Sequence, residues 1–191
     1  FANYFLHMSD VTFDMASNKM EVHNRYAESW KVTLVDTGEL TQTGGRLKRI
    51  ENYLDDTFCL TYGDGVSDIN INQLIKLHQQ EGLEITISAV QPAGRFGSLS
   101  ISKNKVDKFL EKPKGDGQWI NGGFMVCEPS ILKRIKDDET ILEQDPLIGL
   151  AKDGKMAVKK HKGFWSPMDT LRDRNYLEEL WANNNAPWKI W

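Results

Sequence analysis

Cysteine is scarce in this chain, with only Cys59 and Cys127 among its 191 residues. Small secreted domains that depend on disulfides carry far more. Both residues lie in apolar runs of strand character, so the pattern favours two reduced core thiols over a disulfide. Because thiols stay reduced in the cytosol, we expect a cytoplasmic protein.

Basic stripes and long apolar runs are missing as well. The longest apolar stretches fall far short of the roughly 20 residues that a membrane-spanning helix needs. Lysine and arginine form no stripe of the kind that nucleic-acid-binding proteins carry, and the formal net charge is −3. We therefore expect neither a nucleic-acid partner nor a membrane partner.

The chain has an ordinary globular composition, with 40% apolar and 27% charged residues. Segments of strand and helix periodicity alternate along most of it. Strands are expected at 11–15, 19–23, 31–36, 58–62, 84–90, 96–101, 105–111, 119–127 and 156–160, and helices at 46–53, around 71–78, from 129 onward, at 143–152 and at 170–183. This alternation predicts one layered α/β domain over residues 1–191 with a mixed sheet.

The most informative segment runs from Phe58 to Gly65. Its first five residues favour a buried strand, which stops at Asp64, directly after Gly63. Ligands of α/β sheets bind where the carboxyl ends of strands open into a crevice, and glycines allow close approach there. A single Asp at such a place suits Mg²⁺ and the phosphates that it carries. The alternative is a plain turn, because Gly-Asp-Gly is also ordinary turn chemistry.

A second candidate site comprises Thr41, Thr43, Gly44, Gly45 and Arg46, directly before an expected helix. Free N–H groups at a helix N-terminus attract anions, and an arginine fork matches phosphate. These residues therefore suit the edge of a nucleotide. The alternative is a glycine-rich turn with a solvated arginine.

Polar groups also occur at two other strand positions. Glu111 and Lys112 end one strand, where a Glu could bind sugar hydroxyls and a Lys a phosphate. They can serve one pocket only if the chain twists before the following proline. Asn121 and Gly122 lie inside an apolar strand, where glycine indicates either close approach by a ligand or a β-bulge.

Asp169 precedes an amphipathic helix. The plain interpretation is a helix N-cap, since Asp or Thr is common there. The functional interpretation is a second carboxylate that faces Asp64 and completes a Mg²⁺ site.

Taken together, these segments resemble the sugar nucleotidyltransferases that activate hexose 1-phosphates. The resemblance runs from Phe1 to Trp191. It is carried by Leu-Val-Asp-Thr-Gly (34–38), Thr-Gly-Gly-Arg-Leu-Lys-Arg (43–49), Thr-Tyr-Gly-Asp-Gly-Val (61–66), Gly-Arg-Phe-Gly (94–97), Glu-Lys-Pro-Lys-Gly-Asp-Gly (111–117), Ile-Asn-Gly-Gly-Phe (120–124) and Met-Asp-Thr-Leu-Arg-Asp (168–173). It implies a three-layer Rossmann-like α/β fold with a mixed, mainly parallel sheet.

The resemblance also implies a reaction. CTP and glucose 1-phosphate would be the substrates, with CDP-glucose, which feeds CDP-deoxyhexose and O-antigen sugar synthesis, and pyrophosphate as the products. UTP or dTTP is the alternative nucleotide, because no side chain here is seen to read cytosine against uracil. A homo-oligomer is expected, since members of the family commonly assemble.

Site roles follow from the same resemblance. Asp64 and Asp169 are expected to hold Mg²⁺, and Lys112 to hold the sugar phosphate and act with them in catalysis. The remaining residues would line the substrates: Gly63, Thr41, Thr43, Gly44, Gly45 and Arg46 the nucleotide, and Glu111, Asn121 and Gly122 the sugar.

The chain departs from the family at its start. The family begins with a strand and a glycine-rich, arginine-bearing loop that cradles the triphosphate, whereas here no glycine precedes Gly38. We therefore expect an N-terminal part to be missing from this chain, and the chain as given to be inactive.

Two other classes compete with this interpretation. A metal-dependent glycosyltransferase also places Asp at a strand end, but it usually needs a second acid two residues later, where this chain has Val66. A nucleotide-sugar-binding or assembly module could keep the fold without turnover. The aromatic tail, which ends in Trp188 and Trp191, is expected either to join subunits or to fold back onto its own domain.

Overall fold

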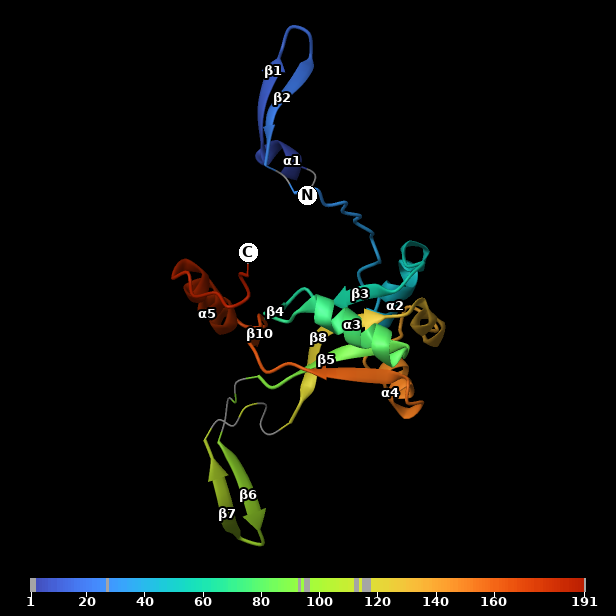
Figure 1. Cartoon of the computed structure of the whole chain (residues 1–191), viewed down its shortest axis with the longest axis vertical. Helices are drawn as coiled ribbons and strands as arrows, with labels where there is room; N and C mark the ends of the chain where they lie inside the picture. Colours follow the sequence, from blue (N-terminus) through green and yellow to red (C-terminus); the bar gives the residue numbers. More distant parts are fainter. Residues whose placement is uncertain are drawn as a thin grey trace. The chain divides into compact units, whose positions relative to one another are not determined.

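The computed structural model describes residues 3–26, 28–92, 94, 97–111, 114 and 118–190. It divides the chain into two compact units, Phe1–Asp36 and Thr37–Trp191. Figure 1 shows the elements of each unit along the chain. The single domain expected over residues 1–191 stays a prediction.

The first unit is a short helix followed by a hairpin. Helix α1 (Tyr4–His7) precedes strands β1 (Ser9–Asp14) and β2 (Lys19–Arg25), which pair antiparallel. The predicted strands 11–15 and 19–23 are confirmed. The Asp14 carboxylate closes the turn by accepting the N–H groups of Ala16 and Ser17.

The strand predicted at 31–36 is wrong, because the structure has no strand there. The segment alternates apolar and polar residues, which favours a strand locally. A strand also needs a partner for its backbone groups, and no described strand pairs with this segment.

A four-stranded sheet forms the centre of the second unit. Its order is β3 (Phe58–Thr61), β8 (Ile120–Cys127), β5 (Ile85–Val90) and β9 (Met156–Lys160). β5 and β9 are parallel, and β8 is antiparallel to both β3 and β5. Three of these strands therefore share one direction, and the predicted mixed sheet is confirmed.

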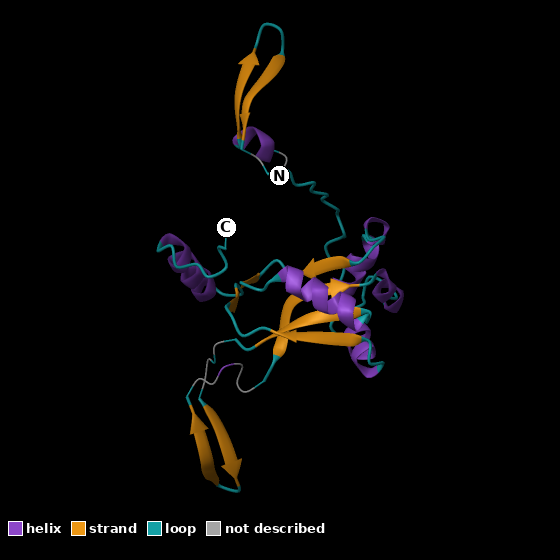
Figure 2. Cartoon of the chain, in the orientation of Figure 1, coloured by secondary structure: helices purple, strands orange, loops and turns teal. Residues whose placement is uncertain are grey.

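Helices cover both faces of this sheet (Figure 2). On one face, helix α3 (Ile71–Glu81) packs on β5, β8 and β9 through Leu74 and His78. Asn70 caps this helix by accepting the N–H of Gln73, and Gly82 ends it with a positive φ of 59°. This is the first outer layer of the predicted three-layer fold.

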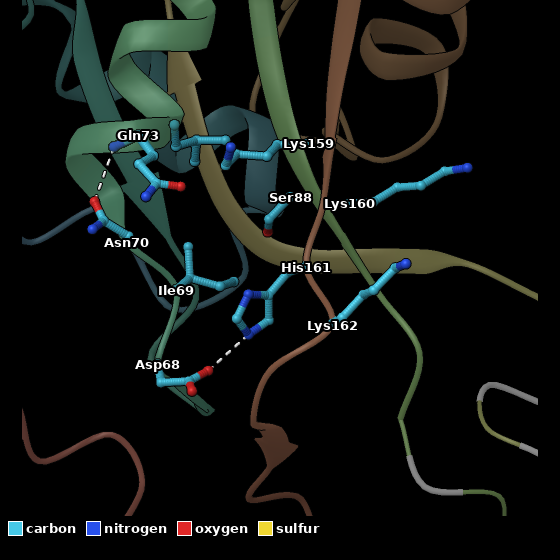
Figure 3. Close-up of a pocket in the computed structure, with 10 residues that line it drawn as sticks. Asp68, Ile69, Asn70, Gln73, Ser88, Lys159, Lys160, His161 and Lys162 are labelled. Carbon is cyan, nitrogen blue, oxygen red and sulfur yellow. Dashed lines mark hydrogen bonds and ion pairs between the residues drawn. The ribbon is translucent and has the colours of Figure 1, made fainter.

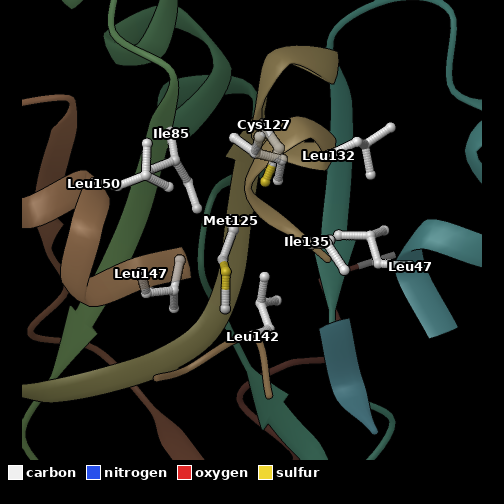
Figure 4. Close-up of a cluster of buried hydrophobic side chains, with 10 residues drawn as sticks. Leu47, Ile85, Met125, Cys127, Leu132, Ile135, Leu142, Leu147 and Leu150 are labelled. Atoms are coloured by element: carbon white, nitrogen blue, oxygen red, sulfur yellow. The ribbon is translucent and has the colours of Figure 1, made fainter. Parts of the chain in front are cut away.

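The other face carries the main hydrophobic core (Figure 4). Helix α2 (Thr43–Arg49), the 3-10 helix η3 (Pro129–Arg134) and helix α4 (Asp145–Lys152) supply it. Their apolar side chains pack against Ile85, Met125 and Cys127 of the sheet; they are Leu47, Ile131, Leu132, Leu147 and Leu150, with Ile135 and Leu142 of the neighbouring loops.

Other elements lie outside the four-stranded sheet. The short 3-10 helix η1 (Glu51–Tyr53) follows α2. Strands β6 (Ser98–Ser102) and β7 (Lys105–Leu110) form an antiparallel hairpin, close to the predicted strands 96–101 and 105–111. Strands β4 (Gly65–Ser67) and β10 (Trp165–Pro167) form a two-stranded ladder that the sequence pattern did not predict.

The last helix, α5 (Leu171–Ala182), begins one residue later than the sequence suggests. Its N-cap is Thr170, which exchanges hydrogen bonds with Asp173 in a capping box, so Asp169 is not the cap. Beyond the helix, the Trp188 ring packs on Phe164 at 5.3 Å between centroids. This tail residue therefore contacts its own unit.

The environment of Cys59 also differs from the prediction. Cys127 is buried in the core as expected, but Cys59 is exposed, because β3 is an outer strand of the four-stranded sheet. Both thiols are free. Within the described residues, no helix combines the length and apolarity that crossing a bilayer requires.

Candidate active site

The β4–β10 ladder brings the two predicted metal carboxylates to one place. Gly65 pairs with Pro167, and the N–H of Met168 donates to the Asp64 carbonyl at 2.8 Å. Asp169 follows Met168 directly, just beyond the end of β10. Both aspartates are exposed at the same end of the ladder, although they are far apart in the sequence.

The donor set at this end fits a hard cation. Mg²⁺ prefers oxygen ligands, and it usually takes only one or two protein carboxylates together with substrate phosphates and water. The described residues contain no group of three or more metal-ligating side chains. A pair of solvent-facing aspartates suits a Mg²⁺ ion that is shared with substrate phosphates.

Space beside Asp64 is open. A Cβ built on Gly63 meets no heavy atom within 4 Å. The backbone is therefore accessible at this residue, as a close contact with a nucleotide would need.

The segment from Gly122 to Phe124 is a β-bulge. In the β5–β8 pairing, Ile87 is opposite Met125 and Ala89 is opposite Asn121, so these three residues of β8 face only Ser88 of β5. A Cβ on Gly122 would lie 2.7 Å from Ser88 Oγ, so this glycine is required by packing. The β-bulge, one of the two interpretations that the sequence allowed for this segment, is confirmed.

The bulge also connects the sheet to the ladder. The indole Nε1 of Trp165 donates to the Gly122 carbonyl at 2.8 Å. Gly123 has a φ of +76°, and a Cβ there would lie 2.8 Å from Tyr62 Cδ2. The N–H of Gly123 donates to Asn121 Oδ1 at 2.9 Å, which fixes the Asn121 side chain next to the bulge.

Tyr62 and Glu143 form a polar network that sequence reasoning missed. The Tyr62 hydroxyl donates to one Glu143 oxygen, and Thr43 Oγ1 donates to the other at 2.7 Å. Burial, followed by the Glu143 carboxylate, raises the pKa of Tyr62, so its hydroxyl stays protonated. The network joins Thr43 to the residue that precedes Gly63. The local sequence could not predict this role of Glu143, because its partners lie far away in the sequence.

The N-terminus of α2 is occupied by the protein itself. The N–H groups of Gly44 and Gly45 donate to the Thr140 carbonyl at 3.0 and 3.2 Å. A Cβ on Gly44 would lie 2.6 Å from Thr140 O, and one on Gly45 would lie 2.5 Å from Asp138 O. These glycines lie inside the helix, and the prediction that their N–H groups are free to bind an anion is wrong. Because they have no side chains, the 138–140 loop can approach the helix closely.

Arg46 holds the chain that leads into this helix. Its guanidinium donates to Thr37 Oγ1 at 2.8 Å and to the Glu39 carbonyl at 2.9 Å. Thr41 is buried nearby, with 8% of its surface exposed. Nucleotide contacts of Thr41, Thr43 and Arg46 stay predictions.

The predicted sugar-phosphate segment is only partly described. Glu111 follows β7 and is exposed. Lys112 lies outside the described residues, so its role stays a prediction.

A cavity of about 310 Å³ lies between the start of α3 and the end of β9 (Figure 3). Its lining includes Asp68, Gln73 and Ser88, with Lys159 and His161 from β9 and the loop after it. Lys160 and Lys162 also border it, but Figure 3 shows their ammonium groups pointing away. None of these residues was a predicted site residue.

Comparison with known proteins gives the class. The sequence pattern of the family described as Nucleotidyl transferase matches residues 9–170, and the chain belongs to this family. It is 55% identical, over its whole length, to glucose-1-phosphate cytidylyltransferase of Salmonella typhi, of which it spans 75%. It is 36% identical to the probable glucose-1-phosphate cytidylyltransferase of Bacillus subtilis over the same shares.

Solved structures agree on the fold. HddC from Yersinia pseudotuberculosis matches with a TM-score of 0.56 at 24% identity, over 75% of this chain and 64% of that one. A putative glucose-1-phosphate thymidylyltransferase from Bacillus anthracis matches with a TM-score of 0.58 at 17% identity, over 80% and 63%. The predicted Rossmann-like nucleotidyltransferase fold is confirmed.

Proposed function

We propose that the protein transfers a cytidylyl group from CTP to α-D-glucose 1-phosphate. The observation that carries this proposal is the 55% identity over the whole chain to the Salmonella enzyme of that name. The end of the β4–β10 ladder that Asp64 and Asp169 flank supports a place for the chemistry, because both residues are exposed there beside open backbone.

In the proposed reaction, a phosphate oxygen of glucose 1-phosphate attacks the α-phosphorus of CTP. A new P–O bond forms, and the bond from that phosphorus to the bridging oxygen of the β-phosphate breaks. Pyrophosphate leaves with the electron pair, and CDP-glucose remains. The protein mainly aligns the two reactants.

Asp64 and Asp169 are the residues that would hold Mg²⁺. When bound, Mg²⁺ would neutralise phosphate charge and polarise the attacked phosphate. The ladder keeps the two carboxylates at one end, since the hydrogen bond between Met168 and the Asp64 carbonyl ties the strands together there. Gly63 would let the nucleotide approach the backbone.

On the sugar side, the proposed contacts are Glu111, Lys112, Asn121 and Gly122. The bulge supports Asn121, because its side chain is held by the Gly123 N–H at the edge where the ladder joins the sheet. Lys112 would bind the sugar phosphate. We therefore expect Lys112→Ala to raise the KM for glucose 1-phosphate more than the KM for CTP, and equal changes would refute a sugar-side role.

The proposed function is tested by pyrophosphate release. CTP, UTP and dTTP are each incubated with glucose 1-phosphate, Mg²⁺ and a full-length version of the protein, and the CTP reaction is expected to be fastest. Faster release with UTP or dTTP would replace the cytidylyl assignment. Calorimetric binding of CDP-glucose without release from any triphosphate would instead favour a binding module.

A homo-oligomer remains part of the proposal. Trp188 packs on Phe164 of its own unit, so this tail residue does not argue for a homo-oligomer. The β6–β7 hairpin supports a homo-oligomer, because it exposes paired apolar side chains. These are Leu99 with Phe109 and Ile101 with Val106, which are 49–66% exposed. Light scattering of the parent chain should give a mass larger than one subunit. We also propose the cytoplasm as the location, in keeping with the two free thiols.

A further inference from the structure

The far end of the β4–β10 ladder is attached to the four-stranded sheet by a histidine–carboxylate pair. His161 continues β9, since its N–H donates to the Ala89 carbonyl of β5 at 2.8 Å. Its ring Nε2 lies 2.8 Å from Asp68 Oδ1, directly after β4, and forms an ion pair with it when the imidazole is protonated (Figure 3). This buried oxygen accepts no hydrogen bond from the described residues. The same nitrogen lies 3.1 Å from the Phe164 carbonyl, directly before β10. One side chain therefore contacts both strands of the ladder.

The Phe164 carbonyl accepts further hydrogen bonds. Ser67 Oγ donates to Phe164 O at 2.8 Å, and the N–H of Asp68 donates to it at 3.3 Å. A Cβ on Gly163 would lie 2.5 Å from Asp68 Oδ1, so only glycine lets the turn come this close. The turn is built around the contact between His161 and Asp68.

We infer that His161 and Asp68 are positioning residues for the two metal carboxylates. A ladder of three residue pairs is too short to hold its own geometry. Two contacts hold it, both at the end formed by Ser67 and Trp165: the bond from Trp165 to the β8 bulge, and the contact between His161 and Asp68. Asp64 and Asp169 lie at the opposite end, so a ladder released from β9 changes their relative placement. The inference rests on the proposed function.

Mn²⁺ binding, followed by the loss of the free-ion electron paramagnetic resonance signal, tests this directly and needs no turnover. The variants are His161→Ala and Asp68→Ala, together with the double variant. Each single variant should weaken Mn²⁺ binding about tenfold, the low end for groups that orient metal ligands. The double variant should bind Mn²⁺ about as tightly as the single variant with the lower affinity, because the two side chains act as one contact.

The sign of the two effects separates positioning from simple charge. Through-space electrostatics predicts that Asp68→Ala weakens Mn²⁺ binding, whereas His161→Ala strengthens it or leaves it unchanged. Positioning predicts that both weaken it. His161→Gln, whose amide nitrogen can reach Asp68, should recover much of the affinity.

A matched control comes from a second histidine–carboxylate pair, which joins helix α3 to the residue after β8. His78 Nε2 lies 2.9 Å from Glu128 Oε1, away from the ladder. Glu128→Ala should lower the melting temperature and leave Mn²⁺ affinity unchanged. Equal Mn²⁺ losses in Glu128→Ala and Asp68→Ala would overturn the inference, as would unchanged affinity in His161→Ala. A parent chain that binds no Mn²⁺, or binds it equally after Asp64→Asn, would overturn the proposed metal site itself.

Discussion

The glycines at the start of α2 and the glycine beside Asp64 looked alike in the sequence but differ in the structure. Gly44 and Gly45 are buried, and their missing side chains make room for the carbonyls of the 138–140 loop. Gly63 is exposed, and no heavy atom of the described residues lies within 4 Å of the position a Cβ would take there. A glycine before a polar residue therefore indicates close approach, while only the fold decides whether protein or ligand approaches.

The largest effect on metal binding is expected at Asp64, which directly follows the exposed Gly63. Asp64→Asn removes a direct ligand, so Mn²⁺ affinity should fall by more than the about 10–100-fold cost of disturbing outer groups. The side chain is exposed, so the free energy of unfolding should change by no more than about 0.5 kcal/mol. Asp56→Asn, another exposed aspartate, is the control for charge alone. Equal Mn²⁺ affinity in both variants would exclude Asp64 as a ligand.

The comparison itself is tested by two matched glycine substitutions. Gly45→Ala places a Cβ 2.5 Å from Asp138 O, and overpacking of this kind costs about 1–3 kcal/mol of unfolding free energy. Gly63→Ala meets open space and should change stability by less than about 0.5 kcal/mol. Urea unfolding measures both. Calorimetry should show weaker CDP-glucose binding for Gly63→Ala alone, and similar stability losses would mean that the two glycines do not differ.

Tyr62 directly precedes Gly63, and its hydroxyl is linked through Glu143 to Thr43 at the start of α2. Tyr62→Phe removes its hydrogen bond to Glu143. We expect a loss of about 1.5–3 kcal/mol in unfolding free energy near neutral pH, typical of a bond to a charged group. Because the folded-state pKa of Tyr62 is raised, its contribution is fully present below the unfolded pKa of about 10 and is lost as pH rises toward the folded value. The parent's stability should therefore fall more steeply than the variant's above about pH 10. Parallel urea curves at pH 8 and pH 10.5 would contradict this.

The smallest effect concerns the residues at the start of α5. Thr170→Ala removes the capping box and should cost about 1 kcal/mol, while Asp169→Ala should leave stability almost unchanged. In Mn²⁺ binding the order should reverse, with Asp169→Ala the damaging change. A stability loss confined to Asp169→Ala would return that residue to a capping role.

Much of the fold was visible in the sequence because its elements are long enough to show a period. The helix around Ile71 and Leu74 and the strand 156–160 appear where their apolar spacing predicts them. β4 and β10 have three residues each and contain glycine or proline, so neither has a period to detect. The segment 31–36 shows the opposite case, with a strand pattern and no partner strand in the described residues.

By itself, the sequence determined the family, the α/β alternation, and Asp64 and Asp169 as candidate carboxylates, since these depend on local residue types and their order. Only the tertiary structure decided that both aspartates lie at one end of a ladder, that Thr170 caps α5, and that the α2 glycines serve packing. It also decided that His161 meets Asp68. Each of these contacts depends on hydrogen bonds or close packing between residues that fold topology brings together, and local sequence carries no record of which partner is chosen.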